Sequence, residues 1–373
     1  MAGIYIHIPF CRKACHYCNF HFSTVQKQRR EMVKAIAGEI LLRREYVQEN
    51  ISTVYFGGGT PSILDTDDLQ LLLETLRGAF VINNDAEITL EANPDDIDEK
   101  KTASWRTLGI NRLSIGVQSF FDKDLIWMNR AHNASQSVNC IKLAQAEGFS
   151  NMSIDLIYGV PGMSDERWKA NAEKAISLNI PHLSCYALTV EPSTALEKMI
   201  QMHKKEGTDA DMQSRQFMQL MQWMRDAGYL HYEISNFAKP GMQSKHNSSY
   251  WQGRPYLGLG PSAHSFNGES RQWNISNNAL YIKNIKENTV PFEAEHLTAR
   301  QKQNEYIMTS LRTSEGISMQ HIKETFGPAA YERVLNLSFI FINKKMLLEK
   351  NAHLILTDEG KLFADGITAD FFA

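Results

Sequence analysis

Three cysteines, Cys11, Cys15 and Cys18, are spaced so that their thiolates can share one soft-metal centre. Thiolates select zinc or iron–sulfur clusters over harder ions. A structural zinc site needs four protein ligands, and the nearby histidines that could complete such a set are His7, His16 and His21. A cubane cluster held by three cysteines leaves one iron open to an external ligand. An open cluster, a zinc site and unligated thiols are all compatible with this spacing alone.

The other two cysteines, Cys140 and Cys185, stand alone in segments whose patterns are typical of a helix and a strand. A buried free cysteine behaves as a small hydrophobic residue. Five cysteines are also too few for a disulfide scaffold in a chain of 373 residues. We therefore expect these two cysteines to have structural roles.

A glycine-rich stretch, Gly57-Gly58-Gly59-Thr60-Pro61, follows the second predicted strand. Glycine lacks the side chain that would keep a ligand away from the backbone, and the absence of a following lysine makes a Walker-type phosphate loop a poor interpretation. Four polar residues elsewhere could meet a ligand that carries both an ammonium and a carboxylate: Glu91, Gln118, Arg130 and Asp155.

Six units of a strand followed by a helix are predicted in residues 1–230. The expected pairs are Ile4–Ile8 with Gln28–Tyr46, Ser52–Phe56 with Thr66–Phe80, Glu87–Glu91 with Asp96–Leu108, Arg112–Val117 with a helical region ending near Glu147, Met152–Ile157 with Asp165–Leu178, and His182–Leu188 with Asp209–Gly228. This alternation predicts an α/β fold with a parallel sheet and right-handed crossovers. Ligands in such folds sit at the carboxyl ends of the strands, so the polar loops should share one mouth.

Two further regions are expected after this first domain. Residues 231–297 form an aromatic and glycine-rich extension that contains the segment His246–Trp251. Residues 298–373 return to helical patterning and end in an expected hairpin and a short helix, Asp358–Ala364, which predicts a small helical domain of winged-helix-like type. Nine basic and nine acidic residues cancel in this last region, which argues against DNA reading.

The overall composition is that of an ordinary soluble globular protein. Lys and Arg number 39 against 42 Asp and Glu, which gives a formal charge of −3 and no general attraction to nucleic acid or anionic membranes. No apolar run approaches the roughly 20 residues that a membrane helix needs. The first ten residues show neither a basic leader nor an apolar core of signal-peptide length, so a cytoplasmic location is expected.

The pattern Cys-x₃-Cys-x-aromatic-Cys after the first strand, with the Gly-Gly-Gly-Thr-Pro loop after the second, resembles the radical S-adenosylmethionine (SAM) superfamily. Five stretches narrow this resemblance to the oxygen-independent coproporphyrinogen oxidase-like branch, and within it to the HemW heme-chaperone group. These stretches are Tyr5–Cys11, Tyr55–Ser62, Asn111–Phe120, Asp155–Gly159 and His246–Trp251. They span nearly the whole chain.

The resemblance implies a partial (β/α)₆ barrel of the TIM type, a [4Fe-4S] cluster on the three cysteines, and SAM on the fourth iron. It places Tyr5 and Tyr17 against SAM, with Tyr17 beside the adenine. The methionine end would be received by Gly58, Gly59 and Thr60, and its polar groups by Glu91, Gln118, Arg130 and Asp155. One electron delivered to the sulfonium would release a 5′-deoxyadenosyl radical. No catalytic residue beyond these contacts is predicted.

Two departures separate this chain from the true coproporphyrinogen dehydrogenases of the branch. Those enzymes carry a further cysteine two residues after the third, where this chain has Phe20, and an extension ahead of the first motif, where only four residues precede Tyr5. Both departures favour the heme chaperones. In that interpretation His246 is a candidate heme ligand, and Tyr250 and Trp251 offer stackable surface; the alternative is a surface turn whose aromatic side chains pack on the barrel.

The leading functional prediction is a cytoplasmic protein, peripheral to the membrane during delivery, that binds heme as cargo and transfers it to a membrane-associated hemoprotein. Its expected partners include an electron donor such as flavodoxin or ferredoxin and a second copy in a homodimer, but no nucleic acid. Three alternatives stand beside it: radical decarboxylation of coproporphyrinogen III propionates, a heme-degrading relative of the radical methyltransferases, and a zinc-stabilised barrel without a redox role.

Overall fold

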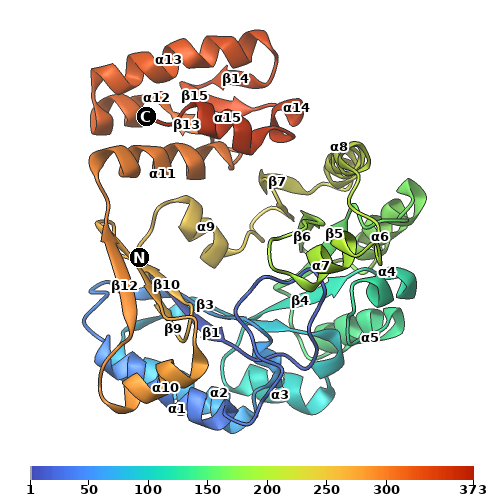
Figure 1. Ribbon diagram of the computed structural model, residues 1–373, viewed down its shortest axis with the longest axis vertical. Coiled ribbons are helices and arrows are strands. Elements are labelled where there is room, and N and C mark those ends of the chain that lie inside the picture. The colour runs from blue at the N-terminus through green and yellow to red at the C-terminus, as the bar shows by residue number, and fades with distance from the viewer. Residues whose placement is uncertain (1) are drawn as a thin grey trace.

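The computed structural model describes residues 2–373 and is built around one twelve-stranded sheet. Its central strands, which pair in parallel in sequence order, are β1 (Ala2–Ile8), β2 (Ile51–Gly58), β3 (Ile82–Ala92), β4 (Arg112–Gln118), β5 (Met152–Tyr158) and β6 (His182–Ala187). The sheet curves into an open barrel, which Figure 1 shows with the strands running from blue to green. The predicted α/β class, with a partial barrel of six strand–helix units, is confirmed.

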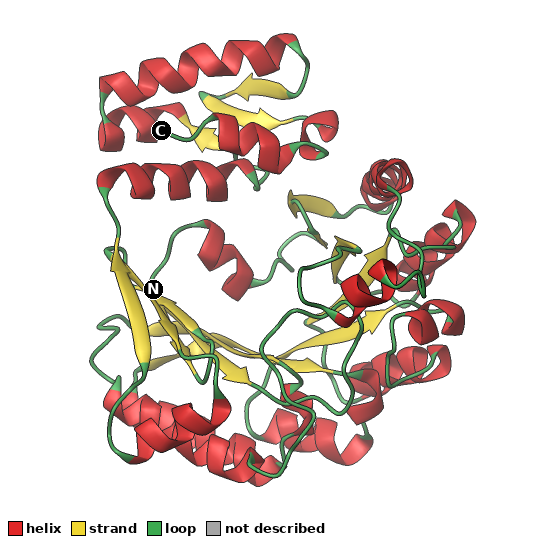
Figure 2. Cartoon of the chain, viewed as in Figure 1, coloured by secondary structure: helices red, strands yellow, loops and turns green. Residues whose placement is uncertain are grey.

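Helices cover the convex face of this sheet (Figure 2). They are α1 (Arg29–Leu42), α2 (Thr66–Ala79), α3 (Glu99–Thr107), α4 (Asp122–Trp127), α5 (Ala134–Ala146), α6 (Asp165–Ser177) and α8 (Ala210–Asp226), with short 3₁₀ turns at Pro61–Ile63 and Pro94–Asp96. Helix α7 (Ala195–Gln201) lies instead beside the cysteine loop, where the Leu196 N–H donates to the His16 carbonyl at 2.7 Å. In α8, Phe217, Leu220, Met221 and Met224 recur at helical spacing and are buried. Burial of one apolar stripe fixes each helix against the strands.

The extension continues the same sheet at both of its edges. Strand β8 (Asn236–Ala238) adds antiparallel to β6, and β7 (Leu230–Glu233) adds antiparallel to β8. At the other edge, β9 (Tyr256–Leu259) adds parallel to β1. Three antiparallel pairings then complete the sheet through β10 (His264–Phe266), β11 (Ser270–Asn274) and β12 (Phe292–His296), and helix α10 (Asn278–Lys286) packs on α1.

Helix α9 (Lys245–Trp251) lies on the concave side of the sheet, between the curved strands and the C-terminal helices (Figure 2). It contacts β1 and β2. Its first two backbone N–H groups, those of Lys245 and His246, donate to the buried carboxylate of Glu87 at 3.2 and 3.1 Å. A carboxylate at a helix N-terminus satisfies donors that the helix itself leaves free, so this contact fixes the start of α9.

The C-terminal unit has its own hydrophobic core and its own three-stranded sheet in the order β13-β15-β14. Its elements are α11 (Ala299–Leu311), β13 (Ile317–Ser318), α12 (Met319–His321), a π-helical turn (Ile322–Phe326), α13 (Pro328–Asn343), β14 (Leu347–Lys350), β15 (His353–Leu356), α14 (Asp358–Lys361) and α15 (Ala364–Asp370). Helix α11 starts with a capping box, in which Thr298 and Gln301 satisfy each other's backbone N–H groups.

Within residues 2–373 we find no helix that combines the length and the apolar character needed to cross a membrane.

Candidate functional site

A cavity of about 360 Å³ opens where the central strands of the barrel end. We call it the thiol cavity. The predicted site residues that line it are Cys11, Cys15, Tyr17, Cys18, Gly58, Gly59, Thr60, Glu91, Gln118, Arg130 and Asp155. They lie on β1 to β5 or on the loops that follow these strands, as expected for a parallel barrel. All predicted site residues except Tyr5 and His246 therefore meet in one place.

The cysteine loop is held in place by backbone hydrogen bonds. The N–H of Cys11 donates to the carbonyl of Ser23 at 3.0 Å, and the N–H of Ser23 returns to the carbonyl of Pro9 at 2.9 Å. The N–H of Cys18 donates to the carbonyl of Cys15 at 3.3 Å. All three thiols are free and partly exposed. The loop is thus closed at its base and leaves its sulfurs accessible from the cavity.

Two of the sulfurs receive a hydrogen bond from the cavity wall. Thr60 Oγ1 donates to Cys11 Sγ at 3.4 Å, and Arg130 Nη1 donates to Cys15 Sγ at 3.3 Å. Burial raises the pKa of Cys11 to about 11 and also raises the pKa of Cys18. Without a ligand, the thiols of Cys11 and Cys18 are therefore protonated at neutral pH, and binding of a metal centre has to release their protons.

The positions of the side chains support a single bound metal ion less well than a larger metal centre. Across the described part of the chain, no group of three His, Cys, Asp or Glu side chains converges closely enough to hold one ion. The histidines considered for a fourth zinc ligand are also engaged: His7 Nε2 with the His21 carbonyl at 2.8 Å, His16 Nδ1 with the Trp127 carbonyl at 3.2 Å, and His21 Nε2 with Asn278 at 2.8 Å. The geometry gives the zinc alternative no complete ligand set.

Arg130 links the cysteine loop to two other walls of the cavity. Its Nη2 donates to Asn93 Oδ1 and to the Gly116 carbonyl, both at 2.7 Å, and Asn93 Nδ2 donates to Thr60 Oγ1 at 3.2 Å. Although burial alone lowers the pKa of Arg130, the neighbouring Tyr17 and Cys15 hold it above its ordinary value. Its Nε is buried and has no hydrogen-bond partner within residues 2–373. A permanent cation with one donor left over is suited to an anionic ligand group.

Glu91 and Asp155 bring two carboxyl groups into the same cavity. Tyr55 donates its hydroxyl hydrogen to Glu91 Oε1 at 2.8 Å. Burial raises the pKa of Glu91 to about 8 and that of Asp155 to about 6, and Asp155 contributes to the rise at Glu91. Two partly buried acids whose charges are incompletely compensated favour a cationic partner, such as the ammonium group of a ligand.

Replacing Glu91 by glutamine should stabilise the metal-free, ligand-free protein at alkaline pH. The folded-state pKa of Glu91 is about 8, above its ordinary value of 4.5. The protonated carboxyl group therefore makes its full contribution to the stability of the fold below pH 4.5, and this contribution is lost as the pH rises through 8. Above pH 8, Glu91→Gln should exceed the wild type by about 2–4 kcal/mol in the free energy of unfolding, with little difference near pH 4.5. Urea titrations at pH 5, 7 and 9 measure this, with the exposed Glu31→Gln as control. Equal stability at pH 9 would contradict the prediction.

The glycine loop leaves no room for side chains at its centre. A Cβ on Gly59 would lie 2.6 Å from the Phe10 carbonyl oxygen and 2.8 Å from that of Ile8. Gly58 has φ +102° and faces the ring of His7. Gln118, at the end of β4, also has positive φ, 65°, an uncommon backbone conformation for this residue type that often marks a functional site.

The two tyrosines predicted to contact SAM lie in different places. Tyr17 lines the thiol cavity. Tyr5 lines a second, larger cavity of about 1360 Å³ that lies between the barrel and the C-terminal unit, which we call the interdomain cavity. The Tyr5 ring stacks on Tyr55 at 6.1 Å, and its hydroxyl is 3.2 Å from His7 Nδ1. Tyr17 thus lines the thiol cavity itself, and the contact between Tyr5 and SAM stays a prediction.

His246 lies in the interior and lines neither cavity. Its side chain is buried at 1% exposure, with Nδ1 2.8 Å from Thr53 Oγ1 and Nε2 2.8 Å from the Tyr250 hydroxyl. The ring also stacks on Tyr55 at 5.0 Å, and burial lowers its pKa to about 3. Both ring nitrogens are occupied, so His246 has no free nitrogen to offer an iron in this arrangement. Its neighbours Tyr250 and Trp251 do line the interdomain cavity.

The donor set of the thiol cavity fits an iron–sulfur cluster with SAM. Three thiols share one opening, two of them already receive hydrogen bonds, a glycine cradle lies beside them, and Arg130 Nε has no partner in the part of the chain described. Sequence reasoning did not assign Asn93, which joins Arg130 to Thr60, although its position at the end of β3 was available as a signal. It also missed the interdomain cavity.

The fold is that of a radical SAM-type barrel with an added C-terminal domain. The radical SAM superfamily model matches residues 5–175, and the HemN C-terminal domain model matches residues 297–363. The heme chaperone HemW of Bacillus subtilis is 32% identical over 100% of this chain and 99% of its own. That of Escherichia coli is 36% identical over 70% of this chain and 69% of its own.

The chain belongs to the HemW heme chaperone family. Among solved structures, coproporphyrinogen III oxidase (HemN) from Escherichia coli matches with a TM-score of 0.87 over 100% of this chain and 90% of its own. The sequence identity to that enzyme is 24%, so this similarity concerns the fold alone.

Proposed function

We propose that this protein is a heme chaperone that carries a [4Fe-4S] cluster and SAM in the thiol cavity and hands heme to a hemoprotein. The observation that carries the proposal is the convergence of Cys11, Cys15 and Cys18 with Glu91 and Asp155 in one cavity. Membership of a family whose curated relatives are named heme chaperones supports the cargo. We propose a cytoplasmic location, with peripheral membrane contact during delivery.

Each wall of the thiol cavity has a proposed role. The three cysteines hold the cluster, and the open cradle of Gly58, Gly59 and Thr60 receives the methionine end of SAM. Glu91 and Asp155 accept from its ammonium group, and Arg130 and Gln118 bind its carboxylate side. Tyr17 packs beside the adenine. The chemistry that such a centre supplies when bound is transfer of one electron to a sulfonium.

The interdomain cavity is the proposed place for the cargo. Its volume of about 1360 Å³ exceeds the roughly 300–1000 Å³ of most small-ligand sites. Aromatic rings and basic side chains on its walls suit a flat apolar macrocycle with two carboxylates. We propose that the acceptor is a membrane-associated hemoprotein, that a flavodoxin or ferredoxin supplies electrons, and that the chain forms a homodimer.

Loss of one cluster cysteine should remove the cluster but leave heme binding intact, because the two cavities share only Asn19 and Phe20. After anaerobic reconstitution, Cys15→Ala should fall from about four irons and four sulfides per chain to background. Its heme affinity should stay within a few-fold of the wild type. Cys140→Ala, which removes a buried thiol elsewhere, is the control.

The same preparations distinguish the proposed function from its alternatives. Wild-type protein loaded with heme is mixed with an apo-hemoprotein, and transfer is followed by the visible spectrum of the acceptor. Intact heme arriving in the acceptor supports the chaperone. Conversion of coproporphyrinogen III to a vinyl product identifies a dehydrogenase instead, and consumption of heme under reducing conditions identifies a heme-degrading enzyme. A colourless protein without iron and sulfide would overturn the cluster proposal.

A further inference from the structure

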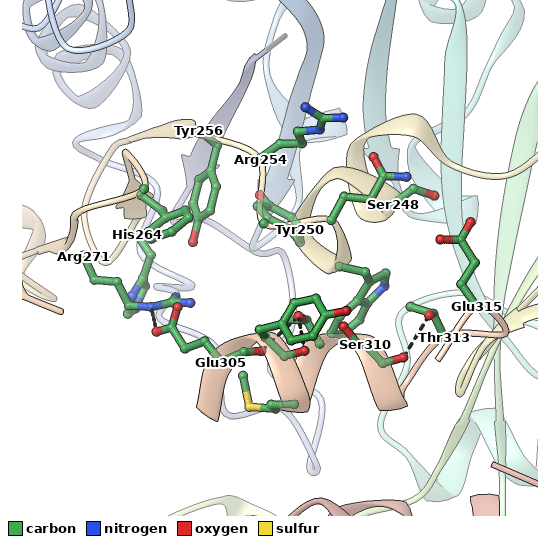
Figure 3. A pocket seen from close by; sticks show the side chains of 18 of the residues that line it. Ser248, Tyr250, Arg254, Tyr256, His264, Arg271, Glu305, Ser310, Thr313 and Glu315 are labelled. Carbon is green, nitrogen blue, oxygen red and sulfur yellow. Dashed lines mark hydrogen bonds and ion pairs between the residues drawn. The ribbon is translucent and has the colours of Figure 1, made fainter. Parts of the chain in front are cut away.

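The interdomain cavity is walled by two parts of the chain that meet only in the folded protein. One wall comes from the extension and carries Tyr256, His264 and Arg271; the other comes from α11 and the segments after it and carries Glu305 and His321. Figure 3 shows His264, Tyr256 and Arg271 grouped at one end of the cavity. An ion pair between Arg271 and Glu305 joins the two walls at this end.

The histidines on these walls differ in how many of their ring nitrogens have a hydrogen-bond partner. Both ring nitrogens of His7 have partners, and His21, His321 and His353 each have one ring nitrogen engaged, with Asn278, Thr325 and the Asn351 carbonyl respectively. His264 has no hydrogen bond to either ring nitrogen among the residues described, and its side chain is exposed to the cavity. Its ring is the freest to turn toward a bound metal.

The protonation of His264 suits metal binding. Partial burial and the nearby guanidinium of Arg271 lower its pKa below the ordinary value, so the neutral imidazole dominates at pH 7. Neutral imidazole is the form that binds iron. Trp273 flanks the ring, with the ring centroids 6.3 Å apart.

The surroundings of His264 supply the other two features that a heme needs. Apolar surface comes from Tyr250, Tyr256 and Phe266, whose rings follow one another at centroid distances of 4.6 and 6.4 Å. Positive charge comes from two arginines. Arg271 is already paired with Glu305, whereas Arg254 has no ion-pair partner anywhere in residues 2–373 and lines the same cavity. A free guanidinium matches a propionate carboxylate.

We propose that His264, and not His246, is the axial ligand of heme iron in the interdomain cavity, and that Arg254 pairs with a propionate. This inference rests on the proposed function, because it assumes that heme is the cargo. It assigns His246 a positioning role: its ring ties α9 to β2 through Thr53, and so holds Tyr250 against the cavity. Heme is therefore bound by the extension and covered by the C-terminal unit.

The test is a heme titration of the full chain and of single variants, read by the Soret band, the electron paramagnetic resonance signal and the dissociation constant. His264→Ala should lose the histidine-ligated spectrum and bind heme roughly tenfold or more weakly, and added imidazole should restore the spectrum. Arg254→Gln should weaken binding several-fold with an unchanged spectrum. His321→Ala is the matched control from the opposite wall and should keep the spectrum.

Each outcome bears on a different statement. An unchanged spectrum in folded His264→Ala, or loss of the spectrum in folded His321→Ala or His246→Gln but not in His264→Ala, would overturn the assignment while leaving the chaperone function standing. If the wild-type chain itself binds no heme, the proposed function fails first. Circular dichroism of every variant separates loss of a ligand from loss of the fold, and imidazole rescue of His264→Ala occurs only if the emptied site is intact.

Discussion

Gly59→Ala should prevent assembly of the cluster, with iron and sulfide falling from about four each per chain to near background after reconstitution. A Cβ at this position would lie 2.6 Å from the Phe10 carbonyl oxygen and 2.8 Å from both the Phe10 nitrogen and the Ile8 carbonyl oxygen. All three atoms belong to the backbone, so no side chain can turn aside to make room. Relief requires movement of the segment that leads directly into Cys11.

The size of the effect follows from what that movement disrupts. The N–H of Gly59 donates to the Ile8 carbonyl at 2.9 Å, and Cys11 follows Phe10 immediately. A shift of this backbone displaces Cys11 from Thr60 and changes the spacing of the three sulfurs. Overpacking costs about 1–3 kcal/mol in the free energy of unfolding, which the fold tolerates. The cluster does not tolerate this shift, because all three cysteine sulfurs must reach their irons at the same time.

The matched control is Gly207→Ala, since a Cβ on Gly207 would have no heavy atom within 4 Å and the residue has no positive φ. It should reconstitute like the wild type. The prediction is tested by iron and sulfide analysis of both variants. Thermal unfolding confirms that each variant is folded. A Gly59→Ala protein with a full complement of iron would mean that the loop is far more pliable than these contacts indicate.

The thiol cavity could be predicted from the sequence because its parts are local. Each of its walls lies at or near the end of a regular strand, and strands such as Ile4–Ile8 show clear hydrophobic patterns. The carboxyl ends of parallel strands necessarily meet. Cys11, Gly58 and Gln118 are therefore brought together by the topology alone.

The absence of Tyr5 from the residues that line the thiol cavity has a simple physical reason. Side chains alternate along a strand, so Tyr5 and His7 share one face of β1 while Ile4, Ile6 and Ile8 share the other. Tyr5 lies in the middle of the strand and faces the interdomain cavity, whereas the thiol cavity starts only beyond Ile8. The sequence motif gives the order of the residues along β1, but it does not show which of them lie close enough to the end of the strand to line the thiol cavity.

His246 shows a second limit of pattern reasoning. Residues four apart on a helix are neighbours, so the His-Asn-x-x-Tyr-Trp segment places His246 and Tyr250 in mutual contact within α9. The same spacing could equally offer a ring to a ligand. The two possibilities are a ring that packs in the interior and a ring that faces a ligand. They differ only in how α9 packs against β1 and β2, which lie far from α9 in the sequence, and in this structure the ring is buried.

The interdomain cavity was out of reach for a related reason. Strands β9 to β11 have three to five residues each, too few for a clear alternation of polar and apolar positions. The pairing of β9 with β1, on which β10 and β11 then build, joins segments about 250 residues apart. The position of His264 and Arg271 opposite α11 follows from that pairing.

Glu39→Ala should cause a large loss of stability, about 3–5 kcal/mol in the free energy of unfolding. Glu39 is fully buried in α1 and accepts four hydrogen bonds, from Arg43, the Gly260 N–H, the Asn274 amide and the Tyr281 hydroxyl. Asn274 lies on β11 and Tyr281 on α10, while Gly260 directly follows β9 and Arg43 directly follows α1. One side chain thus adds a polar tie between the barrel and three segments of the extension, beside their strand pairing and helix packing.

Removal of the carboxylate leaves the buried guanidinium of Arg43 without its counter-charge and takes the acceptor from the Gly260 N–H and the Tyr281 hydroxyl, while Asn274 keeps only its bond to the Gly260 carbonyl. Breaking a buried pair in this way costs about 3–5 kcal/mol, against a total stability of about 5–15 kcal/mol for a typical domain. The midpoint of urea unfolding, followed by circular dichroism, should fall accordingly. Glu39→Gln keeps one acceptor oxygen and should lose less.

Glu31→Ala is the matched control because Glu31 also lies on α1 and also pairs with α10, through Lys286 at 3.4 Å. Both partners of that pair are more than half exposed, so its loss should cost about 0–1 kcal/mol. A small effect of Glu39→Ala, comparable to that of Glu31→Ala, would mean that the extension is held by its strand pairing alone. A large effect, accompanied by weaker heme binding under conditions where the chain is still folded, would show that the Glu39 contacts keep the wall carrying His264 and Arg271 in place.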